Sequence, residues 1–300
     1  MSTPTRPLQA PAPAAATPTL DAATTLGPVR LIVSDLKRQQ RFYERAIGLR
    51  TLASGESEAT LGTEPGAPLV ELVANPSATT PPPGATGLFH LAILVPDRPW
   101  LARALRRVVD AGWRLTGASD HLVSEALYLD DPESNGIEIY RDRPREQWRY
   151  VDGQLAMGTL ALDIDSLITE LPAGDDDGIG SGTRIGHVHL RVADIAAAEA
   201  FYAGVLGFDV TVRGYPGALF VSAGGYHHHI GLNTWHSRGG SPHPASSRGL
   251  ERYEIVLPDA ASLPAVTARL AAASIPTEQR DGQVLVSDPS GNRLALVAAG

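Results

Sequence analysis

The alternation of apolar and polar residues along the chain predicts short strands that lead directly into helices. From Gly27 to Asp35 apolar residues occupy every second position, which is typical of a strand with one buried face. Between Asp35 and Gly48 the apolar residues follow helical spacing instead. The aspartate is suited to cap the amino end of this helix, and the glycine is suited to end it. The segment therefore predicts a strand, a helix and a turn.

This pattern is repeated along the chain. The first copy recurs 159 positions later without a gap, and residues 90–97 match residues 252–259 at an offset of 162. The first set of matched pairs is Gly27 and Gly186, Val29 and Val188, Leu31 and Leu190, Val33 and Val192, Asp35 and Asp194, Phe42 and Phe201, Tyr43 and Tyr202, and Gly48 and Gly207. Each repeat predicts one module, formed by a strand, a helix and about three further strands. The four predicted modules are 26–75, 87–142, 184–236 and 248–298.

The second and fourth modules also share a turn signal near their ends. Asp131, Pro132 and Asn135 match Asp288, Pro289 and Asn292. Proline fits the first central position of a turn, and asparagine or glycine fits the left-handed position. This motif predicts a hairpin between the last two strands of each module.

The composition of the segments outside the modules predicts the domain organisation. Residues 1–25 are rich in Ala, Pro and Thr and carry too little apolar surface to fold, which predicts a flexible tail. The stretch 146–183 includes the polar run 174–178 and separates the modules two by two. We therefore expect a first half at 26–145, a linker at 146–183 and a second half at 184–300.

The charge and the residue types of the chain exclude several functions. Its net charge of -8 without a basic run makes nucleic acid and membrane surfaces unsuitable partners. No apolar run approaches the length of a membrane span and no secretory signal is present, so a cytoplasmic location is expected. Cysteine is absent. Disulfides and thiolate ligands are thereby excluded, and any metal must be bound by nitrogen and oxygen atoms.

Three segments resemble motifs of the vicinal oxygen chelate superfamily, namely residues 187–194 (HVHLRVAD), the pair 201–202 (FY) and residues 131–138 (DPESNGIE). This superfamily contains glyoxalase I, fosfomycin resistance proteins, bleomycin-binding proteins and type I extradiol ring-cleaving dioxygenases. The longer stretches SEALYLDDPESNGIEIY and SAGGYHHHIGLNTW are similar to four-module proteins of the catechol 2,3-dioxygenase type. The resemblance implies an α+β fold of four βαβββ modules, paired into two cupped, partly closed sheets.

The resemblance also implies a metal site. In the superfamily the ligands come from the first strand of a module, seven residues before its aspartate, and from a glutamate on the last strand. Here those positions hold His90, Glu138 and His187, a facial triad that would leave coordination positions of Fe(II) open. This set requires the second module to pair with the third. If the third paired with the fourth, as in the extradiol dioxygenases, Arg252 and Ala295 would stand at ligand positions, and neither can bind a metal.

A run of three histidines is the second candidate for chemistry. If residues 227–231 form a strand with Gly231 facing inward, alternation points His227 and His229 into the cavity, and His229 could be a fourth ligand. The resemblance instead makes His227 and His228 the counterpart of a histidine pair, with His228 as the acid-base residue. A bulge at the start of the strand would reconcile the two interpretations.

Four further residues are candidates for substrate binding. His121 could line the mouth of the cavity, although a solvated loop position is an alternative. Tyr140, Asn233 and Trp235 could pack against a planar ring or bond its oxygens, although packing in the core also explains the two aromatic residues.

The function implied is an extradiol dioxygenase that uses Fe(II) and O2 to cleave a small aromatic diol, with catalysis by His227, His228 or His229. Mn(II), Ni(II) and Zn(II) are the alternative metals. A glyoxalase-like isomerase or lyase and a metal-free protein that sequesters a small molecule are the alternative functions. Self-association into a homodimer is left open.

Overall fold

The structure of the protein is a computed structural model that describes residues 19–63, 66–174 and 178–299. Most of the predicted flexible tail, residues 1–18, lies outside the described residues, as do residues 175–177 of the polar run in the linker. Residues 19–24 run along the third module, where the Leu20 amide donates to the Gly207 carbonyl at 2.7 Å. No helix in the described ranges has the length and apolar character needed to span a membrane.

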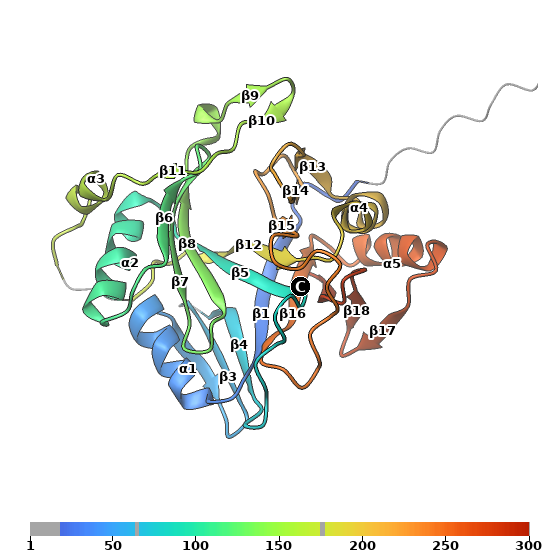
Figure 1. Ribbon diagram of the computed structural model, residues 1–300, viewed down its shortest axis with the longest axis horizontal. Coiled ribbons are helices and arrows are strands. Elements are labelled where there is room, and N and C mark those ends of the chain that lie inside the picture. Colours follow the sequence, from blue (N-terminus) through green and yellow to red (C-terminus); the bar gives the residue numbers. More distant parts are fainter. Residues whose placement is uncertain (1–18, 64–65, 175–177, 300) are drawn as a thin grey trace, which may run out of the picture.

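Two large sheets dominate the fold (Figure 1). Across the eight-stranded sheet the order is β17 (Thr277–Arg280), β18 (Gln283–Ser287), β19 (Arg293–Ala298), β16 (Gly249–Leu257), β1 (Thr25–Val33), β4 (Ala67–Ala74), β3 (Glu58–Thr63) and β2 (Arg50–Ser54). Across the nine-stranded sheet it is β11 (Leu160–Ala161), β6 (Gly117–Asp120), β7 (Ser124–Asp130), β8 (Gly136–Asp142), β5 (Gly87–Leu94), β12 (Arg184–Arg191), β15 (Ile230–Asn233), β14 (Ala218–Ser222) and β13 (Asp209–Val212). The predicted fold of four modules in two cupped sheets is confirmed.

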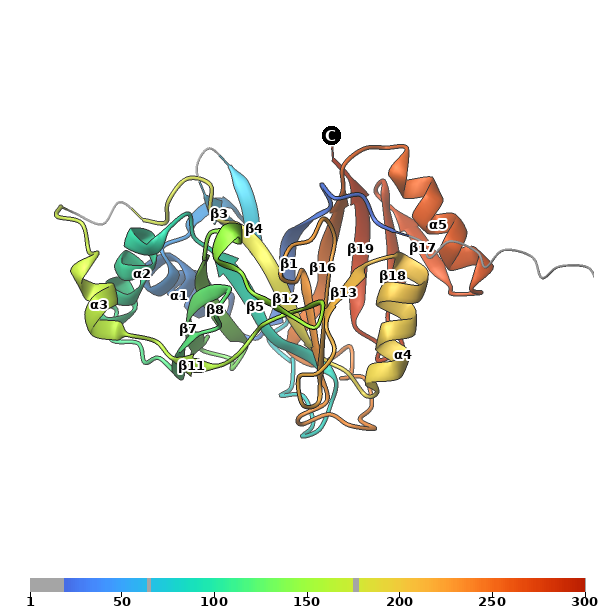
Figure 2. The same cartoon turned by 90° about the horizontal axis from the view of Figure 1, so that it is seen from above.

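Helices cover both ends of the two sheets. They are α1 (Leu36–Phe42), α2 (Arg98–Asp110), α3 (Ile164–Thr169), α4 (Ile195–Glu199) and α5 (Ser262–Ala272), with π-helical turns at Tyr43–Ile47 and Ala200–Leu206 and a 3-10 turn at Arg145–Gln147. Figures 1 and 2 place α1, α2 and α3 at one end of the molecule and α4 and α5 at the other. The short hairpin of β9 (Tyr150–Val151) and β10 (Gln154–Leu155) stands above β11 in Figure 1.

Each sheet joins one module from each half of the sequence. β5 of the second module pairs with β12 of the third, and β1 of the first pairs with β16 of the fourth, both antiparallel. The predicted pairing of the second and third modules is therefore confirmed, and the alternative of a third module beside the fourth is wrong.

Alternation along β5 explains how one strand serves both a core and a cavity. Leu91 and Ile93 are fully buried in the main hydrophobic core. His90 and Ala92 alternate with them and therefore face the opposite, cupped side of the sheet. The polar side chain His90 on β5 thus faces the cupped side of the sheet. The apolar side chains on the other face stabilise the fold by burial.

The predicted helix caps are confirmed, and the predicted turn needs one correction. Asp35 accepts from the backbone amide of Arg38, and Gly48, at φ +88°, ends the helical segment. In the β7–β8 turn the left-handed residue is Ser134 at φ +67°, not Asn135. Asn135 contributes to the turn through its side chain instead, since its amide donates to Asp131 Oδ2 at 2.8 Å.

Candidate active site

Three donor atoms converge on the cupped face of the nine-stranded sheet. His90 Nε2 lies 3.0 Å and His187 Nε2 3.1 Å from the same oxygen, Glu138 Oε2. The two Nε2 atoms are 3.3 Å apart, and all three side chains are buried. Within the described residues, these three form the group of histidine and acidic donors compact enough to hold a metal ion.

The register of three neighbouring strands brings these donors together. Ala92 on the central strand β5 lies opposite Glu138 on β8 and opposite His187 on β12. Because Ala92 ends at its methyl group, the space above it stays open for the two longer side chains. His90 stands two residues before Ala92 and so faces the same side of the sheet.

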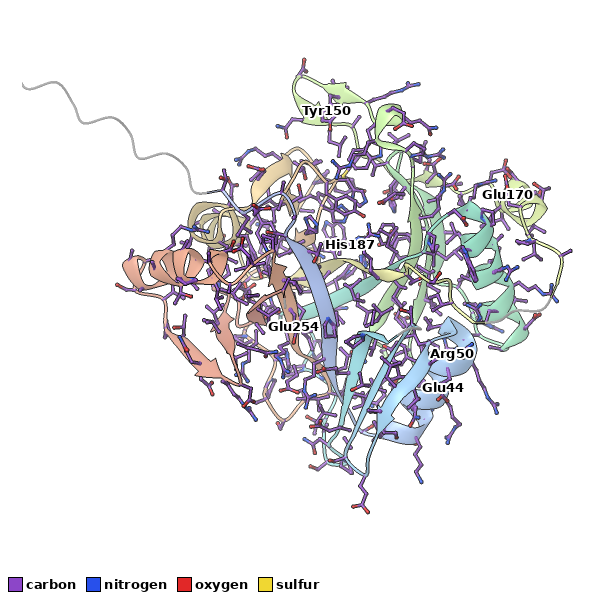
Figure 3. The ribbon with its side chains drawn as sticks, turned by 180° about the vertical axis from the view of Figure 1, so that it is seen from behind. Glu44, Arg50, Tyr150, Glu170, His187 and Glu254 are labelled. Carbon is purple, nitrogen blue, oxygen red and sulfur yellow. The ribbon has the colours of Figure 1, made fainter. Side chains whose placement is uncertain are left out.

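Packing beside the site fixes the orientation of the His187 ring. The ring of Tyr140 lies 4.8 Å from that of His187. Gly186 permits this approach, because a Cβ there would overlap the Tyr140 hydroxyl. Figure 3 shows His187 near the middle of the molecule, in contrast to Tyr150 on the projecting hairpin.

The electrostatics of the three residues suit a divalent cation. Burial alone would raise the pKa of the Glu138 carboxyl, but the imidazoles of His187 and His90 outweigh it and hold that pKa well below its ordinary value. Burial lowers the pKa of His187 to about 4, against the opposing charge of Glu138. At neutral pH Glu138 is therefore ionised and His187 is neutral, so both offer lone pairs to a metal.

The three ligand atoms contact one another at the centre of the group. Two facing Nε2 atoms at 3.3 Å cannot both carry a proton without repulsion, so at least one of them presents its lone pair to the centre. His187 Nδ1 is buried without a hydrogen-bond partner, which fits a ring held by its packing and by a bond at Nε2. The two nitrogens and one carboxylate thus fit a metal such as iron, manganese, nickel or zinc.

A cavity of about 340 Å³ opens beside the three donors. Aromatic rings supply much of its wall. Those rings belong to Phe89, Tyr128, Tyr215, Phe220 and Trp235. Residues 157–159, from the segment between the second and third modules, close one side, and Thr159 Oγ1 lies 2.8 Å from the Tyr215 hydroxyl. Among the described residues, the lining contains no Lys or Arg.

His121 and Tyr128 form a short hydrogen-bonded chain at this cavity. His121 Nδ1 lies 2.6 Å from the Gly158 carbonyl, which can only accept, so Nδ1 carries the proton. Its Nε2 is 2.6 Å from the Tyr128 hydroxyl. Burial, together with the charge of Glu138, raises the pKa of Tyr128 well above its ordinary value. With its proton on Nδ1, His121 accepts at Nε2 from the Tyr128 hydroxyl, which stands beside the candidate metal centre.

The three consecutive histidines do not follow the predicted strand alternation. Gly224 and Gly225, at φ +62° and +65°, make a turn, and β15 begins only after His229. The interpretation of 227–231 as one strand is therefore wrong, because residues 227–229 lie in the irregular segment between that turn and β15. Of the three side chains, His228 lines the cavity. Burial and neighbouring imidazoles hold its pKa well below the ordinary value.

His229 and His227 lie away from the cavity lining. His229 Nδ1 accepts from the Ala223 amide at 3.1 Å, and its ring borders a separate hollow of about 160 Å³ beside Gly186. The structure does not bring His229 to His90, Glu138 and His187 as a fourth donor. His227 is fully buried behind His228.

Of the four residues predicted to bind substrate, two line the cavity and two do not. His121 and Trp235 line the cavity. Tyr140 packs beside His187 on the same face of the sheet, but its hydroxyl is 2.8 Å from that of Tyr226 and it is not part of the cavity lining. Asn233 is fully buried and accepts from the Trp235 amide through Oδ1, which assigns it to the wall behind the cavity.

His189 is a cavity residue that the sequence analysis missed. It lies two residues after His187 on β12, hence on the same face, and its Nε2 is buried without a partner. Gly231, the counterpart of Glu138 in the third module, is opposite His189, and a Cβ there would press on the His189 ring at 2.9 Å. It could have been found in the sequence, because alternation along a strand places it on the same face as His187.

The equivalent face of the eight-stranded sheet contains ion pairs instead. Arg252, at a position equivalent to His90, is 3.7 Å from Glu71, the counterpart of Glu138. Arg30 contacts Glu71 at 3.0 Å and Glu251 at 2.9 Å. Guanidinium groups have no lone pair for a metal, so the expectation that Arg252 cannot serve as a ligand agrees with a face held together by charge pairs.

Comparisons with known proteins agree with this architecture. The catechol-2,3-dioxygenase of Bacillus subtilis (strain 168) is 45% identical over 281 residues, covering 91% of this chain and 97% of the relative. A solved Bacillus subtilis structure described as a candidate dioxygenase has a TM-score of 0.63 at 12% identity and covers 93% of this chain and 86% of its own. Glyoxalase I from Zea mays has a TM-score of 0.57 at 16% identity, covering 92% of each chain. These two structures share the fold.

One family model spans both pairs of modules. It matches residues 25–139 and 184–296, and its description is the Glyoxalase/Bleomycin resistance protein/Dioxygenase superfamily. The matched ranges contain the strands that hold His90, Glu138 and His187. The chain therefore belongs to the glyoxalase, bleomycin resistance protein and dioxygenase superfamily.

Proposed function

We propose that the protein is an extradiol ring-cleaving dioxygenase that uses a divalent metal and O2 to open a catechol-type aromatic diol. The convergence of His90, Glu138 and His187 beside an aromatic cavity carries this proposal. The 45% identity to a catechol-2,3-dioxygenase over most of both chains supports it.

His90, Glu138 and His187 would hold the metal, and Fe(II) is the ion that this reaction favours, with Mn(II) as a substitute. Bound iron would supply the point at which the diol and dioxygen meet, and the path for electrons between them. Both atoms of dioxygen enter the product, so no external reductant is needed.

The side chains around the cavity have separate tasks. His228 is suited to take the proton of a diol hydroxyl and return it later, because its neutral ring faces the cavity. The Tyr128 hydroxyl, which donates its proton to His121, keeps oxygen lone pairs that can accept a hydrogen bond from a hydroxyl of the substrate. The walls formed by Phe89, Phe220 and other rings can enclose the planar ring and exclude water.

Iron loading tests the proposed reaction. Protein purified without chelator, then loaded with Fe(II) under anaerobic conditions, should turn catechol into a yellow ring-cleavage product once air is admitted. Bound nickel or zinc with no ring cleavage would favour a glyoxalase-like isomerase or lyase instead. Protein that binds none of these metals in stoichiometric amount would favour a sequestering protein and contradict the proposal.

The cavity also predicts which diols are accepted. Its described lining has no cation, and the buried carboxylate of Glu138 faces it. Because the metal would be occupied by the two diol oxygens and by Glu138, the carboxylate of a carboxylated catechol would be buried against a wall whose described residues include no Lys or Arg. We expect kcat/KM for 3,4-dihydroxybenzoate to be at least about 100-fold below that for 4-methylcatechol, as unpaired polar groups are strongly rejected by such sites.

The measurement is steady-state oxygen uptake with both diols on one enzyme preparation. The variant Thr159→Arg introduces a cation into the lining of the cavity. It should reduce the difference in kcat/KM between the two diols. Equal kcat/KM values for the two diols with the unmodified protein would contradict the assignment of an uncharged substrate.

A further inference from the structure

A hydrogen-bonded chain reaches His228 from behind the cavity. Asp142 Oδ1 lies 2.9 Å from His227 Nε2, and His227 Nδ1 lies 2.7 Å from His228 Nδ1. Among the described residues no other hydrogen bond engages either imidazole ring. The chain thus begins at a carboxylate and ends at the ring that faces the cavity.

The acceptor at the start of this chain determines the proton position on both rings. An ionised carboxylate can only accept, so His227 Nε2 must carry a proton. With one proton on its ring, His227 has a lone pair on Nδ1, and the proton in the 2.7 Å contact then belongs to His228 Nδ1. His228 is left with a bare lone pair on Nε2, the nitrogen that takes part in no other hydrogen bond.

Packing holds the middle of the chain rigidly. His227 is fully buried, with the ring of Tyr226 at 4.1 Å and that of Trp148 at 5.6 Å. Its carbonyl accepts from Thr211 Oγ1 at 2.7 Å. The ring can neither turn over nor withdraw without disturbing these contacts, so its two nitrogens are committed to Asp142 and His228.

Asp142 lies beside several cationic side chains. It borders a second hollow of about 450 Å³, separate from the substrate cavity, on the other side of the histidine pair. Several arginines line that hollow and offset the charge of the carboxylate. They are Arg98, Arg141, Arg143, Arg145 and Arg184. Tyr226 also donates to Asp142 Oδ1, at 3.1 Å.

We propose that Asp142 and His227 are positioning residues that act through His228. They fix its Nδ1–H tautomer and the direction of its ring, so that Nε2 is ready to accept a proton in the cavity. Alternation along β8 explains why Asp142 is available, because it stands four residues after Glu138 on the same face of the strand. The part of this inference that concerns catalysis by His228 rests on the proposed dioxygenase function.

The first test removes the carboxylate and then supplies it from solution. In the iron-loaded enzyme, Asp142→Ala should lower kcat by about 10- to 100-fold, the usual effect of losing a supporting partner. KM for catechol and the metal content should be unchanged. Formate should restore part of the lost kcat in a saturable way, because it can enter the arginine-lined hollow, and it should leave the wild type and His227→Phe unaffected.

Tyr226→Phe is the matched control. It removes the hydroxyl that contacts Asp142 Oδ1 and the Tyr140 hydroxyl, while keeping the ring that packs on His227. We expect its kcat to stay close to that of the wild type. An Asp142→Ala enzyme with wild-type kcat, or with a loss that formate does not reverse, would overturn the proposal.

The second test needs neither metal nor substrate. Nitrogen-15 NMR of histidine-labelled protein, with the signals of His228 assigned by comparison with His228→Gln, reports which ring nitrogen carries the proton. We expect a protonated Nδ1 and a bare Nε2 in the wild type. A protonated Nε2 there would refute the positioning role even if ring cleavage were established, and the expected tautomer would support it even if ring cleavage failed.

Discussion

Alanine in place of His187 is expected to abolish metal retention while leaving the fold intact. His187 supplies one of three donors and lies 3.1 Å from Glu138 and 3.3 Å from His90. Its loss should weaken metal binding by more than about 100-fold, because partners that only support a ligand already contribute 10- to 100-fold. Metal analysis after dialysis, with circular dichroism as the check on folding, measures this effect.

His121→Ala is the matched control for that measurement. His121 lines the same cavity but is not one of the three converging donors, so this variant should keep its metal. Stoichiometric metal in His187→Ala would show that the site lies elsewhere. Loss of metal in both variants would point to a general collapse of the cavity.

Replacing His228 by glutamine should lower kcat by about 100- to 10,000-fold, which is the range for removing a positioned acid or base. Metal content should not change, because His228 is not among the three converging donors. KM for the diol should change little, since the aromatic walls remain. The measurement is steady-state oxygen uptake by iron-loaded protein, normalised to its iron content.

His229→Gln distinguishes the two interpretations of the histidine run. The His229 ring borders another hollow, so its replacement should leave kcat within a few-fold of the wild type. A larger loss of kcat in His229→Gln than in His228→Gln would support the interpretation in which His229 faces the cavity. The turn at Gly224 and Gly225 argues against that interpretation.

Much of the fold could be predicted because the sequence repeats itself. The caps at Asp35 and Asp194 and the stops at Gly48 and Gly207 depend only on local chemistry, and all four are confirmed. The pairing of the second and third modules also followed, since Arg252 lacks the lone pair that a ligand needs.

The parts that could not be predicted depend on local irregularity or on distant contacts. Alternation fails for His228 because a turn, and not a strand, precedes β15. The closure of the cavity by Thr159 requires a segment between modules to reach Tyr215, 56 residues away, and no local pattern reports such a contact. Asp142 could have been found by following β8 onward from Glu138.

Isotope tracing of the reaction tests the central claim most directly. Iron-loaded protein should be given catechol and oxygen labelled with oxygen-18, and the product should be analysed by mass spectrometry. The proposed function predicts a ring-opened product that contains both labelled atoms before exchange with water. A product with an intact ring, or one without label from dioxygen, would contradict it.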